Sequence, residues 1–367
     1  MHKILYILTF LLFFNISAEA KEIEEKVYDW ISSLQKPSGL VEETENSNLV
    51  SLYSNSLAAI VYTYKEDYSK AKKIFLWFKR NKKELNSAPG GFGQFRDTKG
   101  FTSAPHRWMG DNCWLLIALN YYKKKTGDTQ FTSLAKDIEK WIRDLQDQDG
   151  GLWGGYNPNL TQIEKNSEGN IDALNAISGF DKFHKNLFIF LRDKRWDKKN
   201  NVFTTKWPPY EHAPDLISWG YLALGNKYKH FLDFADRFMI AKKSTLGPVV
   251  KGIAFDLVEK DGIWIEVTGQ MALAYKVAEM DKKAQFLIKE IEKMYVPSNS
   301  NKNIGGIVYS TGQGTMFGPE PLWKGADTNP VLGTSCWYLM AKWGIDAMRI
   351  GRINIIKGLK KEGLYYK

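Results

Sequence analysis

The sequence has few of the residues on which disulfide scaffolds and common cofactor sites depend. Its 367 residues include two cysteines and five histidines, which leaves little material for a disulfide framework or a histidine-based metal centre. His-Glu-x-x-His, Cys-x-x-Cys, Walker-type glycine loops and Gly-x-Ser-x-Gly elbows are all missing. Asp147-Gln148-Asp149-Gly150 lacks the later ligands of a calcium loop and is interpreted as a turn. We therefore expect no metal and no cofactor.

Apolar runs long enough to span a bilayer are also missing. The run from Ile4 to Phe14 covers about eleven residues, against the roughly twenty that a span needs. It follows the basic Met1-His2-Lys3 and precedes Ser17-Ala18-Glu19-Ala20, an A-x-A cleavage pattern. These features predict a signal peptide at residues 1–20, cleaved after Ala20, and one domain over residues 21–367. The mature protein is expected to be periplasmic or secreted, monomeric and without a stable membrane span.

Charge and cysteine placement fit this prediction of export. The net charge of +10 would suit nucleic acid, but export argues against such a partner, so we expect no nucleic acid. A solvated lysine-rich surface, or a face for anionic polysaccharide or lipid, is the better interpretation. Cys113 and Cys336 lie in apolar, helix-like segments, and we expect two buried free thiols.

Aromatic residues, in contrast, are abundant. Thirteen Trp, eighteen Tyr and twenty Phe make up 14% of the chain, more than packing normally requires. Many of these rings should therefore lie partly exposed at some surface. Trp30, Phe75, Trp141 and Phe231 fall in charged, amphipathic segments and are expected to pack in the interior.

A glycine next to an apolar residue recurs along the chain at intervals of roughly 50 to 60 residues, about the length of two helices with their loops. The six positions are Ser38-Gly39-Leu40, Gly90-Gly91-Phe92, Gly150-Gly151-Leu152-Trp153, Asn201-Val202-Phe203 (without glycine), Gly252-Ile253-Ala254-Phe255 and Gly305-Gly306-Ile307-Val308-Tyr309. Each is followed by an Ala-rich helical pattern, which we expect to be buried on all sides. These segments are Asn48 to Tyr64, Gly110 to Tyr122, Ser167 to Ile177, Ala213 to Leu224, Ile263 to Ala278 and Gly333 to Trp343.

A second set of helical segments carries more charge and should have one solvated face. It consists of Glu22 to Leu34, Tyr68 to Lys82, Phe131 to Asp147, Phe180 to Asp193, Lys227 to Ala241 and Lys282 to Met294. Twelve helices in alternating inner and outer sets predict an all-α fold, an (α/α)6 toroid of six helical hairpins with long loops at one mouth.

With this repeat, three segments give the chain a family resemblance from about Glu22 to Trp343. They are Ser167-Glu168-Gly169-Asn170-Ile171-Asp172-Ala173, Trp264-Ile265-Glu266-Val267-Thr268-Gly269-Gln270-Met271-Ala272 and Gly333-Thr334-Ser335-Cys336-Trp337-Tyr338. The chain resembles the six-hairpin superfamily of carbohydrate-active enzymes, without a match to one particular family. Related toroids often carry a bulkier polar residue where this chain has Gly169, which would leave room or remove a contact.

Inner helices of such a ring run in one direction, so their N-terminal ends meet at one mouth. Their first turns carry Asp111, Glu168, Asp215 and Glu266. Acidic residues also cap helix N-termini, which is the structural alternative for each. Aromatic rings beside them, on which the C–H faces of sugars stack, favour a glycan site. The residues expected to bind glycan are Tyr53, Trp108, Asn112, Trp153, Tyr156, Asn170, Asp215, Trp219, Trp264, Gln270 and Trp323.

Glycoside hydrolysis needs one protonated and one ionised carboxyl. Glu168 and Glu266, from the third and fifth hairpins, are the leading catalytic pair, and Asp111 is the third candidate. The resemblance implies an inverting mechanism, in which the two carboxyls stand roughly 6.5 to 9.5 Å apart. The predicted substrate is a poly- or oligosaccharide. We expect residues 305–330 and 90–108 to form two walls of the cleft.

Two other functions stay open at this point. A polysaccharide lyase on the same toroid would use a Tyr or His base and an arginine, for which His106, His212, Tyr210, Arg96 and Arg107 are available. A noncatalytic glycan-binding or assembly protein is the other alternative. The segment 145–153 also resembles a repeat of terpenoid cyclases, but the chain contains no Asp-Asp pair, which argues against that chemistry.

Overall fold

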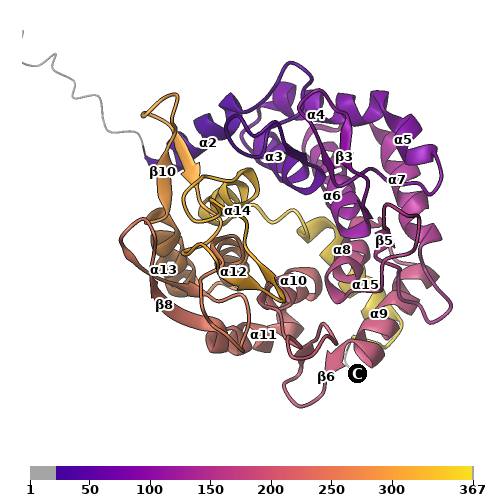
Figure 1. Cartoon of the computed structure of the whole chain (residues 1–367). Helices are drawn as coiled ribbons and strands as arrows, with labels where there is room; N and C mark the ends of the chain where they lie inside the picture. Colours follow the sequence, from indigo (N-terminus) through magenta and orange to yellow (C-terminus); the bar gives the residue numbers. More distant parts are fainter. Residues whose placement is uncertain (1–21, 366–367) are drawn as a thin grey trace, which may run out of the picture.

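The computed structural model describes residues 22–365 and consists mainly of helices. The predicted signal peptide therefore lies outside the described residues. The inner helices are α3 (Leu52–Tyr64), α6 (Met109–Thr126), α8 (Ser167–Ala176), α10 (Pro214–Leu224), α12 (Ile265–Val277) and α14 (Leu332–Trp343). Each inner helix packs against the next along the chain, and α14 packs against α3. These contacts close the inner helices into a ring (Figure 1).

A second set of helices surrounds this ring (Figure 1). It comprises α2 (Ile23–Ser33), α4 (Tyr68–Arg80), α5 (Lys82–Asn86), α7 (Thr132–Asp144), α9 (Lys182–Lys194), α11 (His230–Phe234) and α13 (Asp281–Glu292). Most of these helices pack on the inner helix that precedes them, whereas α2 packs on α14. Helix α2, the first helix of the described chain, therefore pairs with α14, the last helix of the inner ring.

Sequence pattern explains which helices lie inside. Helix α12 buries eleven residues, including the polar Thr268 and Gln270, because its neighbours cover it on every side. Helix α7 buries only Leu134, Ile138, Trp141 and Ile142, a spacing that places four apolar side chains on one face of a helix. The predicted difference between fully buried and one-sided helices is confirmed for these two.

The segment 227–241 differs from its prediction as a helix. It forms the short 3-10 helices η1 (Asn226–Tyr228) and η2 (Ala235–Phe238) on either side of α11, and then turns into strand β8 (Met239–Lys243). Strand β8 pairs with β9 (Val249–Ile253). The apolar residues of 228–238 fit a helical spacing, but Met239 and Ile240 belong to a hairpin, where side chains alternate between two faces.

The remaining strands are short and pair in antiparallel hairpins close to the loops. They are β1 (Val50–Ser51), β2 (Phe95–Arg96), β3 (Thr102–Ala104), β4 (Arg107–Trp108), β5 (Gly155–Tyr156), β6 (Trp196–Asp197), β7 (Val202–Phe203), β10 (Tyr295–Pro297), β11 (Gly305–Ile307), β12 (Met316–Phe317) and β13 (Glu320–Pro321). The order of strands in each small sheet follows the chain. Strand β1 pairs with β2 across α3, α4 and α5, and β4 pairs with β5 across α6 and α7.

Buried polar side chains of the inner helices hold the repeated turns in place. Asn55, Asn112 and Asn170 each accept a hydrogen bond from a backbone N–H of the turn and donate one to the C=O of the same residue. The turn residues bound in this way are Val41, Phe92 and Leu152. In the last two hairpins hydroxyl groups replace the amides, with Thr268 bound to Ile253 and Ser335 to Ile307. This shared device ties these five turns to the N-terminal half of an inner helix.

A last helix, α15 (Arg349–Lys361), follows the ring and was not predicted. It packs against α8 and α10, where Arg352 donates a hydrogen bond of 2.6 Å to the carbonyl of Leu222 near the C-terminal end of α10. Tyr365 donates to the carbonyl of Leu224 in the same way. Since the inner helices begin at the opposite side, α15 covers the base of the ring at α8 and α10 and leaves the other end open.

The structure also bears on the predictions for the two cysteines and for membrane-spanning helices. Cys113 and Cys336 are free and buried, as expected from their apolar surroundings. Among residues 22–365, no helix combines the length and the hydrophobicity that crossing a bilayer requires.

Candidate active site

The N-terminal turns of the inner helices surround a cavity of about 530 Å³. Helix α3 contributes Tyr53 and Ser54, and α6 contributes Asp111 and Trp114. The further helices and loops supply Glu168 and Asp172 of α8, Asp215 and Trp219 of α10, Glu266 and Gln270 of α12, together with Glu43, Gln94, Phe95, Trp264, Tyr309, Phe317, Trp323, Lys324 and Asn329. The closed ring therefore brings side chains from distant parts of the sequence to one site.

Carboxyl groups are the main chemical feature of this cavity. Six carboxyl side chains line it: Glu43, Asp111, Glu168, Asp172, Asp215 and Glu266. Asp172 is 1% exposed and Glu266 is 7% exposed, whereas Glu168 is open to the cavity. Among the described residues, no Lys, Arg or His forms an ion pair with any of the six.

Crowding of these groups controls their protonation. Desolvation inside the cavity raises the pKa of Glu168 well above its ordinary value, and the nearby charges of Asp215 and Asp111 raise it further. Burial raises the pKa of Asp172 in the same direction, with repulsion from Glu168 as the next cause. Both groups therefore favour the protonated form at neutral pH.

The other four carboxyls have smaller shifts. Desolvation raises the pKa of Glu266 to about 8, with repulsion from Glu43 adding to it. Desolvation also raises the pKa of Glu43 to about 7 and that of Asp111 to about 7. Desolvation raises the pKa of Asp215 only to about 6, because the N–H of Leu216 donates a hydrogen bond of 2.9 Å to its carboxylate.

Hydrogen bonds distinguish Glu266 from Glu168. The hydroxyl of Tyr53 lies 3.4 Å from Glu266 Oε1, and the hydroxyl of Thr334 lies 3.5 Å from Oε2. Trp337 Nε1 donates to the Tyr53 hydroxyl at 2.6 Å and so orients it. A Cβ atom at Gly333 would approach Glu266 Oε2 to 3.0 Å, so glycine at this position gives the carboxyl room. Within residues 22–365, Glu168 receives no hydrogen bond to its side chain.

Aromatic rings form one wall and the rim. Trp264 contacts Phe317 with ring centroids 4.6 Å apart, and Tyr309 contacts Trp323 at 4.6 Å. Trp323 and Phe317 are 50% and 43% exposed, which leaves apolar ring faces available at the entrance. The predicted wall of residues 305–330 is confirmed by these contacts, whereas only Gln94 and Phe95 line the cavity from the predicted wall of residues 90–108.

Comparison of the structure with known proteins reveals the same architecture elsewhere. An alpha-amylase from Clostridium perfringens aligns with a TM-score of 0.65 at 11% identity, over 90% of this chain and 99% of its own. A wild-type glycosidase aligns at 0.63 and 10% identity, over 89% and 96%. Cellobiose 2-epimerase from Bacillus thermoamylovorans B4167 aligns at 0.61 and 12% identity, over 87% and 95%. No family model and no curated protein matches the sequence.

The chain shares the six-hairpin fold of these proteins. Because the identities are 10 to 12%, the similarity establishes the fold and leaves the chemistry to the site itself.

In this six-hairpin fold, most of the predicted site residues reach the cavity. The predicted residues that line it are Tyr53, Asp111, Glu168, Asp215, Trp219, Trp264, Glu266, Gln270 and Trp323. Glu43, Trp114 and Asp172 line it as well and were not predicted. For Asp172 the signal was present, since it lies one helical turn after Glu168 and so on the same face. Glu43 lies in a loop before α3, where no helical period could indicate its direction.

Asn112 and Asn170 do not have the predicted role. Both are fully buried, and their amides are hydrogen-bonded to the backbone of Phe92 and Leu152. They hold the turns, and they lie behind the cavity wall. Their position in the first turn of an inner helix had suggested a mouth residue, but the helical rotation turns them toward the loop.

Trp108, Trp153 and Tyr156 also lie away from the cavity. Trp108 and Tyr156 belong to the paired strands β4 and β5, and Lys165 Nζ lies 5.0 Å from the centre of the Trp153 ring. These rings cover a small sheet beside the mouth. Proximity in sequence to Asp111 and Glu168 had favoured them, but the segments that precede α6 and α8 place these three rings outside the cavity lining.

Gly169 has a packing role instead of leaving space. A Cβ atom there would lie 2.9 Å from Asn166 Oδ1 and 3.0 Å from Met109 Cε. The glycine therefore allows α8 to approach the start of α6 closely. Nothing at this position is open to a substrate.

The residues predicted for a lyase are engaged elsewhere. Arg96 is buried, bound to Glu84, and stacked on Trp77 with its guanidinium carbon 4.5 Å from the ring centre. Three further groups also have partners outside the cavity: Arg107 donates to the carbonyls of the 84–91 segment, His212 pairs with Asp197 and Tyr210 donates to Glu259. His106 is part-exposed and lies outside the cavity wall.

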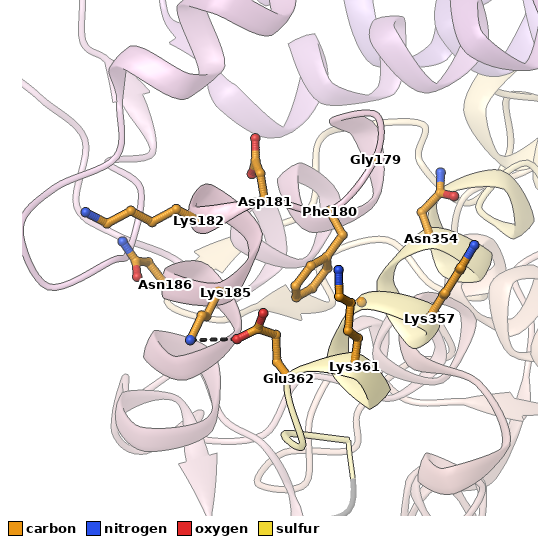
Figure 2. A pocket seen from close by; sticks show the side chains of 11 residues that line it. Gly179, Phe180, Asp181, Lys182, Lys185, Asn186, Asn354, Lys357, Lys361 and Glu362 are labelled. Carbon is orange, nitrogen blue, oxygen red and sulfur yellow. Dashed lines mark hydrogen bonds and ion pairs between the residues drawn. The ribbon is translucent and has the colours of Figure 1, made fainter.

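A larger depression of about 670 Å³ lies between α9 and α15 (Figure 2). Its wall carries Lys182, Lys185, Lys357 and Lys361, and Lys185 is paired with Glu362 at 2.7 Å. It lacks a set of convergent carboxyls and lies at the base of the ring, so size alone does not make it the active site. Across the described part of the chain, no three His, Cys, Asp or Glu side chains are placed to hold a metal ion.

Proposed function

We propose that the protein is an (α/α)6-toroid glycoside hydrolase, exported to the periplasm or secreted, that acts as a monomer on a poly- or oligosaccharide. The observation that carries this proposal is the cavity itself, in which six carboxyls and a wall of aromatic rings meet at the open end of the ring. Such a combination offers partners for sugar hydroxyls and flat surfaces for sugar C–H faces. The glycosidase and amylase among the structural neighbours support the same substrate class.

Glu168 is the proton donor in this proposal. Its pKa is raised well above the ordinary value by desolvation and by neighbouring carboxyls, so the group carries a proton at neutral pH. It is open to the cavity and has no protein partner within the described residues. A protonated, accessible carboxyl is what departure of the leaving-group oxygen requires.

Glu266 is the general base. Desolvation and the charge of Glu43 raise its pKa to about 8, while the hydroxyls of Tyr53 and Thr334 near its two oxygens oppose this shift. The ionised fraction of Glu266 is the form that acts as base. Glu266 then activates a water molecule on the opposite face of the sugar, which gives inversion. Asp111, the third carboxyl of the site, orients a sugar hydroxyl. Trp219, Trp264 and Trp323 provide stacking surfaces.

The test is a screen of the mature protein against neutral and acidic polysaccharides, followed by variants of the pair. Reducing ends should appear with the wild type, and Glu168→Gln and Glu266→Gln should each lower kcat about 10²- to 10⁴-fold. Glu164→Gln, at an exposed position in the loop before α8, is the matched control and should retain full activity. A wild type that binds glycan without cleaving it, or active Gln variants, would contradict the proposal.

Epimerisation is the second candidate, because a cellobiose 2-epimerase is among the neighbours. Epimerisation removes a proton from a sugar carbon. No histidine lines this cavity within the described chain, so the side chains of the cavity favour hydrolysis. Proton NMR of disaccharides incubated in deuterated water separates the two reactions. If deuterium is incorporated at a sugar carbon and the glycosidic bond stays intact, the protein is an epimerase and the hydrolase proposal is wrong.

A further inference from the structure

The cavity contains more carboxyl groups than the proposed hydrolysis uses. Glu168 and Glu266 perform the chemistry, and Asp111 orients a hydroxyl. Glu43, Asp172 and Asp215 remain in the same wall. Each could contact a neutral sugar as an acceptor, but amides or hydroxyls would do so without the cost of placing like charges close together.

Basic groups do not compensate this negative charge. Among the described residues that line the cavity, Lys324 is the single basic side chain, and it is exposed at the rim. The N-termini of the inner helices contribute about half an elementary charge each at most. Six helix ends therefore offset about three of the six possible charges, and a fully ionised cavity stays negative.

Six buried polar side-chain atoms in this wall have no hydrogen-bond partner among the described residues, which indicates a missing ligand, and two of them show which groups it would offer. Asp172 Oδ1 and Trp219 Nε1 are buried without a hydrogen-bond partner, in side chains that are 1% and 3% exposed. One atom accepts and the other donates. A buried polar atom left unpaired costs free energy, so a ligand with both kinds of group would stabilise the site.

Gly110 leaves space beside the Asp172 carboxyl in this wall. Gly110 also lines the cavity, and a Cβ atom there would lie 3.2 Å from Asp172 Oδ2. Glycine at this position therefore leaves space beside the buried Asp172 carboxyl in the cavity wall. In the described chain, no three His, Cys, Asp or Glu side chains are placed to hold a metal ion. An organic ammonium group instead offers hydrogen-bond donors that match carboxylate oxygens.

From these observations we infer that the cavity selects a sugar residue that carries a positively charged amino group, as in a deacetylated amino-sugar polymer. This inference rests on the proposed function and names its substrate class. The ammonium lies between Asp172 and Asp111, and its positive charge favours the ionised form of these two carboxyls when the sugar binds. The ring hydroxyls meet Trp219 Nε1 and Gln270, and the sugar faces stack on the aromatic wall.

The inference is tested by binding of matched sugars to the mature wild-type protein, measured by calorimetry at about pH 6, where a sugar amine carries its proton. The probes are D-glucosamine, D-glucose and N-acetyl-D-glucosamine, together with D-galactosamine and D-galactose. We expect at least one amino sugar to bind tenfold or more tightly than its neutral parent, with affinity that falls as salt is added. Equal binding of amino and neutral sugars, or no binding of either, would overturn the inference.

A variant locates the charge recognition. Asp172→Asn keeps the shape of the side chain but cannot ionise to pair with the ammonium, so the preference for the amino sugar should fall about tenfold, while affinity for the neutral parent changes little. Asp144→Asn, at an exposed ion pair with Lys140, is the control and should leave both affinities unchanged. An amino-sugar preference that survives Asp172→Asn would place the ammonium elsewhere and contradict the assignment to Asp172.

Cleavage assays separate this inference from the proposed function. If a neutral polysaccharide is cleaved and a deacetylated amino-sugar polymer of the same linkage is not, the hydrolase stands and the amino-sugar inference fails. If amino sugars bind selectively and no polymer of either kind is cleaved, the inference stands and the hydrolase fails.

Discussion

Glu43 influences the proposed base from outside the catalytic pair. It accepts a hydrogen bond of 2.9 Å from Ser54, and its repulsion is the next cause, after desolvation, of the raised pKa of Glu266. Since Glu266 has to be ionised to act as base, Glu43 determines how much of the enzyme is in the active form at neutral pH.

Glu43→Gln should therefore move the acidic limb of the pH profile. Without the repulsion, the pKa of Glu266 falls from about 8 toward its ordinary value, and activity persists to lower pH. The quantity to measure is kcat/KM against pH for the wild type and the variant, on the best substrate from the screen. The variant's acidic limb should lie at lower pH, with a similar plateau.

The control for this shift is Glu45→Gln in the same loop, whose carboxylate accepts a hydrogen bond from Trp30 outside the cavity. Its profile should superimpose on that of the wild type. A limb that stays in place in Glu43→Gln, or moves to higher pH, would show that Glu43 does not act on the base.

Single residues also show where inference from sequence ends. Glu168, Asp215 and Glu266 were predictable because each lies in the first turn of a buried helix. Asn112 lies in such a turn as well, yet its amide binds the backbone of Phe92. Helical position gives the level of a side chain along the ring axis, but the direction it points depends on rotation about the helix, which only tertiary packing determines.

At the scale of the element, α15 shows how the base of the ring is closed. Gly351 and Gly358 lie on the face of α15 that meets the ring, where side-chain atoms would overlap the backbone of Asn175 and the ring of Phe180. Glycine lowers the stability of a helix by about 1 kcal/mol relative to alanine, so two of them in one helix indicate a close approach.

Gly351→Ala should destabilise the protein in spite of its better helix propensity. A methyl group would collide with the carbonyl of Asn175 at the end of α8, and relief requires α15 to shift. We expect a loss of about 1 to 3 kcal/mol in the free energy of unfolding, measured by urea denaturation.

Ile353→Ala is the control in the same helix, because Ile353 is 56% exposed and its removal should change the free energy of unfolding by less than about 0.5 kcal/mol. If Gly351→Ala proved as stable as the wild type, α15 would be too loosely packed to close the base.

The elements themselves were largely predictable, for a physical reason. Helices inside the ring are apolar on all faces, whereas helices outside it are apolar on one face. The distribution of apolar residues therefore distinguishes α12 from α7. The segment 227–241 failed because an apolar run of that length fits both a helix and a short helix followed by a strand. Helix α15 was missed since it follows the last repeat, and a repeat pattern contains no information on what covers its base.

At the scale of the whole molecule, closing the ring concentrates like charges that are far apart in the sequence. Glu43 and Glu266 are more than 200 residues apart, yet both line one cavity. In the unfolded chain these carboxyls separate and regain ordinary pKa values. Folding therefore takes up protons at neutral pH, and stability depends on pH in a direction that can be worked out.

The free energy of unfolding should decrease as pH rises from about 5 to about 8. Over this range the folded protein holds protons on groups such as Asp111, whose pKa is raised to about 7, while the unfolded chain, with ordinary values of about 4, does not. Stability falls with pH wherever the folded state binds more protons, and the loss is complete only above the raised pKa values. The melting temperature should thus be higher at pH 5 than at pH 8.

Asp111→Asn tests this explanation, because the amide cannot ionise and Asp111 has a buried oxygen without a partner. The variant should melt a few degrees above the wild type at pH 8, with a smaller gain at pH 5, where Asp111 of the folded wild type is already protonated. Asp144→Asn, exposed and paired with Lys140, should melt in parallel with the wild type at both values. If the Asp111→Asn gain were the same at pH 5 and pH 8, the effect would come from packing, and the concentration of charge in the cavity would not limit stability.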